Sequence, residues 1–188
     1  KNLWREAFPE DSEEFLTYYD QEKMTTNQVL VREEDGIQAM LHLNPYRLLV
    51  RDACWNVDYI VAVATKSTMR HRGYMRSLLL RMMQDMRERQ MPFCFLMPAA
   101  EAIYTPFQFA FIYDQPVWNL KEDIKLKHTS IEETVPAGNM MEMDVADKLV
   151  QQIQPIQMAA DWMQQWLEQR YEVFTKRDTD YVTSLIRE

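Results

Sequence analysis

The spacing of apolar residues predicts a strand, a helix and a second strand in the middle of the chain. Residues 55–65 carry β-branched and aromatic side chains at alternate positions, which is typical of a strand. Over residues 73–90 the apolar side chains return with the 3.6-residue period of a helix, and Pro92 ends it. Residues 93–97 form a short continuous apolar run, typical of a buried strand. This order predicts a right-handed crossover between two parallel strands.

The segments before this unit predict a helix and a hairpin. Asp11 and Glu14 have the spacing of a capping box, so a helix is expected behind them. Residues 29–31 are predicted as a strand, and Asp35-Gly36 is a strong signal for a two-residue hairpin turn. The return strand is expected over residues 37–43, ending at Asn44-Pro45.

The pattern becomes more polar after Trp118. A helix is predicted over residues 158–174, and Asp178 is expected to cap a last helix. We therefore divide the chain into a first domain, residues 1–118, and a linker with a partly helical second segment, residues 119–188.

The composition is that of an acidic chain that can fold. The 188 residues carry a formal net charge of −8, and 47% of them are hydrophobic, which is enough to form a core. An acidic balance argues against nucleic acid as a partner. No apolar run approaches the roughly 20 residues that cross a bilayer, and the first residues lack the apolar region of a signal peptide, so no membrane partner is expected. With only Cys54 and Cys94, and no metal-type spacing of Cys or His, we expect a reduced, cytoplasmic protein without a metal site.

One basic segment differs from this acidic background. Residues 66–89 contain seven Lys or Arg and two acidic residues, and the predicted helix begins just after Gly73. Free N–H groups and the positive end of the helix dipole suit a phosphate there, and a glycine lets an anion approach the backbone. Spacing alone leaves open a second interpretation, an ordinary solvated basic helix.

Two motifs in this region resemble a known family. The residues Arg70-His71-Arg72-Gly73-Tyr74-Met75 fit the Arg/Gln-x-x-Gly-x-Gly/Ala loop of the GNAT N-acetyltransferase superfamily. The loop is most similar to that of the Eis-type (enhanced intracellular survival) branch, with the bulky Met75 where most GNAT proteins have Gly or Ala. A second block, Ile103-Tyr104-Thr105-Pro106-Phe107, resembles a stretch that follows the fifth strand in that branch, with Gln108 where the branch usually has Gly.

The resemblance implies an α/β fold of the GNAT (acyl-CoA N-acyltransferase) type, a mixed central sheet flanked by helices. It also implies acetyl-CoA as co-substrate and the start of a second GNAT-like domain in residues 119–188. The strand positions that match the binding site for the pantetheine arm are Val63, Ala64 and Thr65. The loop positions that match the binding site for the diphosphate are His71, Arg72, Gly73, Tyr74, Met75 and Arg76.

The resemblance also implies a reaction. An amine attacks the thioester directly in a ternary complex, and Tyr104 matches the tyrosine that acts as general acid. From composition alone Tyr104 reads as a core tyrosine, since several aromatic residues surround it in sequence. The branch uses its own terminal carboxylate as general base, and Glu188 is not expected to inherit that role, because this chain stops within the second domain.

The acceptor expected from the resemblance is a primary amine, on a small molecule or a lysine side chain, and the expected assembly is a homo-oligomer. The acidic clusters at residues 10–14 and 122–133 are read as solvated faces or as an electrostatic attraction for such an amine. Two alternatives to an enzyme stay open: a non-catalytic acyl-CoA-binding module and an interaction domain that keeps the fold alone.

Overall fold

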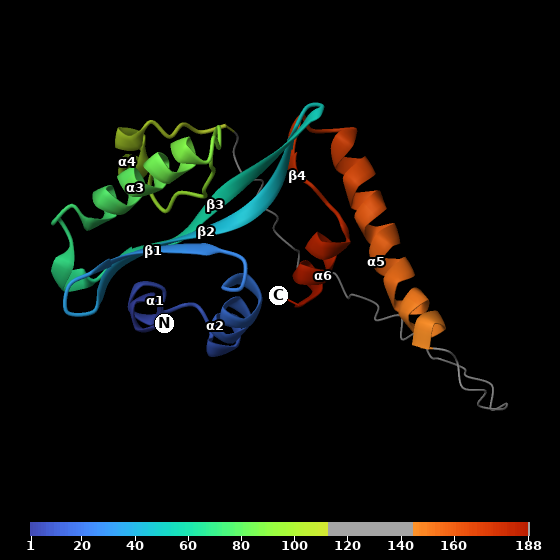
Figure 1. Cartoon of the computed structure of the whole chain (residues 1–188), viewed down its shortest axis with the longest axis horizontal. Coiled ribbons are helices and arrows are strands. Elements are labelled where there is room, and N and C mark those ends of the chain that lie inside the picture. The colour runs from blue at the N-terminus through green and yellow to red at the C-terminus, as the bar shows by residue number, and fades with distance from the viewer. Residues whose placement is uncertain (113–144, 188) are drawn as a thin grey trace, which may run out of the picture.

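A computed structural model of the chain describes residues 1–112 and 145–187. Three strands form its centre: β1 (Gln28–Glu33), β2 (Ile37–Val50) and β3 (Ala53–Thr65). The other elements are α1 (Asn2–Ala7), α2 (Glu13–Tyr18), the π-helical turn η1 (Tyr19–Lys23), the 3₁₀ turn η2 (Ser67–Met69), α3 (Tyr74–Glu88), α4 (Glu101–Tyr104), the 3₁₀ turn η3 (Thr105–Phe107), α5 (Val145–Glu168), β4 (Val173–Thr175) and α6 (Thr179–Arg187). Figure 1 shows α3 and α4 on one side of the sheet and α1 and α2 on the other.

The sheet is an antiparallel meander in the order β1-β2-β3. The predicted hairpin is confirmed, and Asp35 and Gly36 both have positive φ angles, 50° and 98°. The two-residue length is wrong, because residues 34–36 separate Glu33 from its partner Ile37. Strand β2 is the central one, and residues 38–44 are buried without interruption. The sheet therefore has two covered faces at this point rather than one.

Each face of the sheet packs against its own helices. On one face α3 contributes the helical stripe that the sequence predicts, and the core consists of Ala39, Leu41, Leu43, Ile60, Leu78, Leu79, Met82 and Met86. On the other face α1, α2 and η1 cover a second cluster, formed by Leu3, Trp4, Leu16, Tyr19, Met40 and Ala64. Alternate residues of β2 thus face opposite layers, and the described part of the chain is an α/β structure with an antiparallel sheet between helices.

The prediction that Asn44-Pro45 ends the second strand is wrong. Strand β2 continues to Val50, with Pro45 opposite Asp58 of β3. Asp58 and Ile60 direct their backbone groups away from β2, toward Phe95, so Pro45 and Asp58 form a pair without ladder hydrogen bonds. Pro45 therefore needs no N–H on that side, and on its other side neither β1, which pairs up to Leu43, nor β4 pairs at its position.

The strand predicted over residues 93–97 is reduced to one residue. Phe95 forms a parallel bridge with Tyr59, in which Ile60 N donates to Phe95 O at 2.9 Å and Phe95 N donates to Asp58 O at 3.2 Å. The two rings stack with centroids 4.9 Å apart. The predicted parallel crossover through α3 is thus present, but the two strands pair at a single residue.

The C-terminal elements join the same sheet. Strand β4 pairs antiparallel with residues 48–50 of β2, on the edge that β1 leaves free. The prediction of a helix as far as Phe174 is wrong, because α5 ends at Glu168 and Phe174 lies opposite Leu49 in this ladder. The predicted cap of the last helix is confirmed, since Asp178 Oδ1 accepts a hydrogen bond from Tyr181 N at 3.0 Å. The boundary expected at 118/119 lies outside the described residues.

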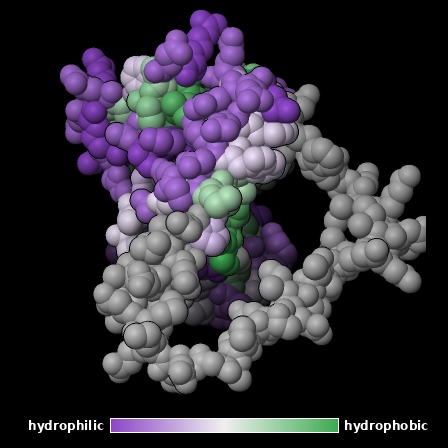
Figure 2. Space-filling model, turned by 90° about the vertical axis from the view of Figure 1, so that its right-hand side faces the viewer, coloured by the Kyte–Doolittle hydropathy of each residue, from purple (hydrophilic) through white to green (hydrophobic). Residues whose placement is uncertain are grey.

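The outer surface on the α5 side is mostly polar. Figure 2 shows hydrophilic residues over most of the described surface on this side, with hydrophobic residues in small areas between them. Three side chains at helical spacing on α5 are exposed: Met158, Trp162 and Trp166. Among the described residues, no helix combines the length and the apolar content that crossing a membrane requires.

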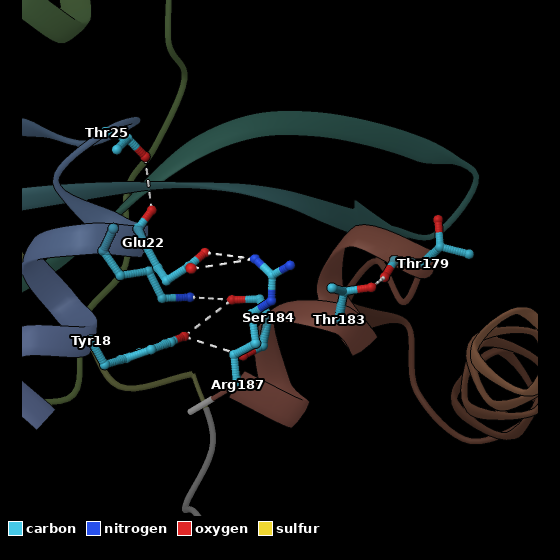
Figure 3. Close-up of polar contacts among 8 residues, drawn as sticks. Tyr18, Glu22, Thr25, Thr179, Thr183, Ser184 and Arg187 are labelled. Carbon is cyan, nitrogen blue, oxygen red and sulfur yellow. Dashed lines mark hydrogen bonds and ion pairs between the residues drawn. The ribbon is translucent and has the colours of Figure 1, made fainter. Parts of the chain in front are cut away.

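Helix α6 lies against α2 and η1. Figure 3 shows the contacts: Tyr18 Oη donates to Ser184 O at 3.2 Å, and Arg187 pairs with Glu22 at 3.1 Å. Lys23 Nζ donates to Ser184 Oγ at 2.7 Å. Together with an ion pair between Arg47 and Asp178, these contacts attach α6 and the residue before it to residues 1–112.

Candidate functional site

The loop between β3 and α3 leaves several backbone donors without acceptors. Helix α3 begins at Tyr74 after Gly73, which supplies no capping side chain, and its first turn holds no acidic residue. The first bond of the helix is Ser77 N to Gly73 O, at 3.0 Å. In the described part of the chain, the amides of Tyr74, Met75 and Arg76 have no acceptor in the protein. This helix start is therefore suited to an anion.

The backbone of the loop is held in an unusual conformation. Gly73 has a φ of 80°, in the left-handed region that favours glycine, and a Cβ built there would meet nothing within 4 Å. His71 also has a positive φ, 62°. The backbone angle thus favours glycine at this position, and the space in front of it is open.

Basic side chains flank these amides in the sequence. His71, Arg72 and Arg76 are exposed, and the Arg76 guanidinium lies 5.9 Å from the centroid of the Phe107 ring. Glu34, at the tip of the β1–β2 hairpin, faces the same loop. A hydrogen bond from Tyr74, followed by the bond from Arg32 and the charges of Arg32 and Arg72, lowers the pKa of the Glu34 carboxyl. The charged groups of the loop and the hairpin tip therefore interact.

Strand β3 contains a feature that the sequence did not reveal. Ala62 and Val63 together lie opposite Leu41, so the strand has a β-bulge, and Ala62 has a φ of 50°. The regular run Val61-Ala62-Val63-Ala64 gives no sign of it, because a bulge of this type favours Gly, Asn or Asp at the left-handed position.

The bulge changes which backbone groups face the bridge to Phe95. Before the bulge, the backbone groups of Asp58 and Ile60 face Phe95. After the bulge, Lys66 N donates to Gln38 O of β2 at 2.8 Å. Because pairs in an antiparallel ladder alternate, the N–H and C=O of Val63 and Thr65 point away from β2 and those of Ala64 point toward it. The predicted strand residues thus separate: Val63 and Thr65 present backbone groups toward that edge, while Ala64 pairs with Met40 and is buried against α1 and α2.

The edge of β3 beside the loop is open. Pairing with Phe95 stops at Ile60, and for residues 61–65 the described residues provide no further backbone partner on that side. Arg70 Nε reaches the carbonyl oxygen of Thr65 at 3.4 Å. An open strand edge therefore leads directly to the uncapped start of α3.

Tyr104 lies at the end of α4 and is buried, with 8% of its surface exposed. Its ring contacts Phe109 edge to face at 5.7 Å, and burial raises the pKa of its hydroxyl. Phe107, which contacts Arg76, follows three residues later. The burial fits the interpretation as a core tyrosine, and the contact of Phe107 with Arg76 connects this segment to the first turn of α3.

Other chemistry is sparse in the described regions. Within residues 1–112 and 145–187, no group of three or more His, Cys, Asp or Glu could hold a metal ion. Two hollows lie away from the loop. One, of about 510 Å³, is lined by Glu13, Glu14, Glu22 and Arg187 among others, and one of about 160 Å³ lies beside Trp4, Tyr19 and His42.

Solved structures are similar to this chain at low sequence identity. A probable N-acyltransferase of unknown function from Enterococcus faecalis is 16% identical, with a TM-score of 0.53, and covers 56% of this chain and 27% of its own. A glucosamine-6-phosphate N-acetyltransferase from Arabidopsis thaliana is 15% identical, with a TM-score of 0.46, and covers 58% of this chain and 80% of its own. This chain thus spans about a quarter of the length of the Enterococcus protein.

Comparison with curated proteins yields no match. The model of the acetyltransferase (GNAT) domain family matches residues 1–112, which is more than half of the chain. The matched region contains the sheet, the bulge, the loop and α3, and the chain belongs to the GNAT acetyltransferase family.

Proposed function

We propose that this protein is an N-acetyltransferase that uses acetyl-CoA and acetylates a primary amine. The observation that carries the proposal is the uncapped start of α3, where Tyr74, Met75 and Arg76 offer free amides beside an open strand edge. A diphosphate would provide the acceptors that these amides lack. The acidic chain concentrates basic side chains at this one segment, which supports an anionic substrate there.

Other residues beside the loop fit the remaining parts of acetyl-CoA. Val63 and Thr65 direct backbone donors and acceptors toward the open edge, where the amides of a pantetheine arm would pair with them as a strand does. Arg72 and Arg76 are exposed and near enough in sequence to add charge-assisted hydrogen bonds to phosphate oxygens. Gly73 leaves space for the diphosphate to approach the backbone.

The proposed reaction is a single displacement. The neutral amine nitrogen attacks the thioester carbonyl carbon, the C–S bond breaks, and the amide forms. The nitrogen loses one proton to a base or to water, and the departing sulfur receives one from Tyr104. A phenol is protonated at neutral pH, as a general acid requires, and burial raises the pKa of Tyr104 further.

The finer placement of the protein rests on resemblance. The Arg72-Gly73 and Ile103-Tyr104 motifs support membership of the Eis-type branch, and with it a cytoplasmic homo-oligomer. The exposed stripe of Met158, Trp162 and Trp166 is compatible with an assembly surface.

The test is turnover with acetyl-CoA. Purified protein is mixed with acetyl-CoA and a panel of amines that includes polyamines, aminoglycosides and lysine peptides, and the release of free CoA thiol is followed. We expect release that depends on one class of amine and saturates with it. No release above the uncatalysed rate with any amine, despite CoA binding, would favour a non-catalytic acyl-CoA-binding module.

That module is the second candidate, and one observation favours it. Tyr104 is buried against Phe109, as a structural tyrosine would be. A protein that binds CoA without turnover, and whose Tyr104→Phe variant differs only in stability, would have this function.

A further inference from the structure

The β1–β2 hairpin holds both ends of the loop that precedes α3. At one end Lys66 N donates to Gln38 O at 2.8 Å, and at the other Tyr74 Oη donates to Glu34 Oε2 at 2.7 Å. Glu34 and Gln38 stand on either side of the hairpin turn. Helix α1 adds a further anchor, because Glu6 Oε1 accepts from Ser67 N at 2.8 Å. Only the middle of the loop is left without these contacts.

The hairpin tip is itself well fixed. Glu34 N donates to Gly36 O at 3.1 Å, across a turn in which Asp35 and Gly36 have left-handed φ angles. Gln38 is buried, with 6% exposed, and its side-chain amide donates to the carbonyl oxygen of Glu34. The tip itself is exposed, but these hydrogen bonds and the two strands of the sheet connect it to the packed core.

The Glu34 carboxylate joins the tip to the helix. One oxygen accepts from Arg32 at 3.0 Å and the other from Tyr74, whose ring lies 5.8 Å from the Arg32 guanidinium. Tyr74 is the first residue of α3, and its amide is one of the free donors. These two contacts hold the Tyr74 side chain, and through it they can restrict the first residue of the helix.

We infer that Glu34 is a positioning residue for the phosphate-binding loop. This inference rests on the proposed function, because it assigns to Glu34 the task of orienting amides that the CoA diphosphate would bind. Glu34 does not contact the substrate in this account; it acts through Tyr74. Neither motif that carries the family resemblance includes it.

Whether removing Glu34 weakens or strengthens CoA binding distinguishes this role from a purely electrostatic one. Glu34 carries a negative charge close to a site for an anion, so by charge alone its removal would strengthen CoA binding. If its task is to hold Tyr74, its removal weakens binding instead. Gln at this position keeps an oxygen that accepts from Tyr74 and loses the charge.

The experiment compares Glu34→Ala, Glu34→Gln and Tyr74→Phe by calorimetric titration with CoA on the whole chain, with the melting temperature of each. Glu34→Ala and Glu34→Gln change the charge equally, so they form a matched pair. We expect Glu34→Ala and Tyr74→Phe to bind CoA about fivefold more weakly, the usual effect of one lost hydrogen bond, and Glu34→Gln to stay within about twofold of the wild type. In turnover, the KM for acetyl-CoA should rise while kcat and the KM for the amine stay constant.

Two results would overturn the inference in distinguishable ways. If the wild type binds CoA and both Glu34 variants bind equally well or more tightly, Glu34 contributes charge only and the positioning role is wrong, while the proposed function stands. If the wild type does not bind CoA at all, the proposed function fails, and the role of Glu34 fails with it.

Discussion

At the scale of single residues, Tyr104 is the side chain whose role separates enzyme from binding module. Tyr104→Phe removes one oxygen from a buried ring that packs on Phe109, so the packing stays. If the hydroxyl protonates the leaving sulfur, kcat should fall about a hundredfold while the affinity for CoA stays the same. Steady-state kinetics with calorimetric titration measure both, and a kcat within about twofold of the wild type would contradict the acid role.

His42 is a second residue with a measurable consequence. It is buried, and Asn27 Nδ2 lies 3.4 Å from its Nδ1. Burial, and then the charge of the amino end of the chain, lowers the pKa of His42 from 6.5 to about 4. Between these values the unfolded chain binds the proton and the folded one does not, so stability is complete above pH 6.5 and is lost as the pH falls toward 4.

The expected loss between pH 7 and pH 5 is about 2 kcal/mol in the free energy of unfolding. Denaturant unfolding at the two pH values measures it. His42→Gln should remove most of this difference, whereas His71→Asn, at an exposed position, should keep it. An equal pH dependence in His42→Gln would show that other groups cause it.

At the scale of elements, Gly73 and Gly36 form a matched pair. Both have positive φ, 80° and 98°, and at neither would a Cβ meet an atom within 4 Å. Alanine at either position should therefore cost a similar strain of about 1 kcal/mol. We expect Gly73→Ala to weaken CoA binding at least tenfold, since it adds a methyl group where the diphosphate would approach and strains the backbone that carries the donors. Gly36→Ala acts only through the hairpin tip, so it should weaken binding no more than Glu34→Ala does, about fivefold. Equal affinities for CoA in the two variants would mean that the loop does not bind CoA.

Local patterns predicted the elements whose signals lie within a few residues. The hairpin at Asp35-Gly36, the apolar stripe of α3 and the Asp178 cap are present, because turn chemistry, helical period and capping act locally. The cap expected at Asp11 is wrong by one residue, since Ser12 Oγ accepts from Phe15 N at the start of α2. Pro45 was misread as a strand end, since the sequence does not show that its missing N–H falls on an edge without a partner. Phe174 was misread as helical, since its strand conformation comes from pairing with Leu49.

The candidate site was predictable to a similar extent. The basic loop and Gly73 were visible as a motif, and their conformation gives the physical reason for it. The bulge at Ala62 could not be predicted, because nothing in that residue favours a left-handed φ. The role of Glu34 could not be predicted either, because it is 40 residues from Tyr74 and only the fold brings them together.

At the scale of the whole molecule, the C-terminal segment is attached to the sheet far from the loop before α3, because β4 pairs with residues 48–50 at the end of β2. Val182 of α6 is buried, with 3% exposed, whereas Leu185 on the same helix is 47% exposed. Val182→Asp places a charge at a buried position of α6 and should cost several kcal/mol, enough to release the helix. Limited proteolysis should then cut the C-terminal segment, while the affinity for CoA changes by less than about twofold.

Leu185→Asp is the control, since it makes the same kind of change at an exposed position and should leave the proteolysis pattern as in the wild type. Loss of CoA binding in Val182→Asp, together with release of α6, would show that the segment supports the loop as well as the sheet.

The central claim is that the amides at the start of α3 bind the diphosphate of CoA. Titrating ¹⁵N-labelled protein with CoA, and following each backbone amide by NMR, tests it directly. The account predicts that the amides of Gly73, Tyr74, Met75 and Arg76 shift most and saturate together, with Val63 and Thr65 following and Gly36 unchanged. Saturable shifts confined to other segments, or no shifts at millimolar CoA, would contradict it.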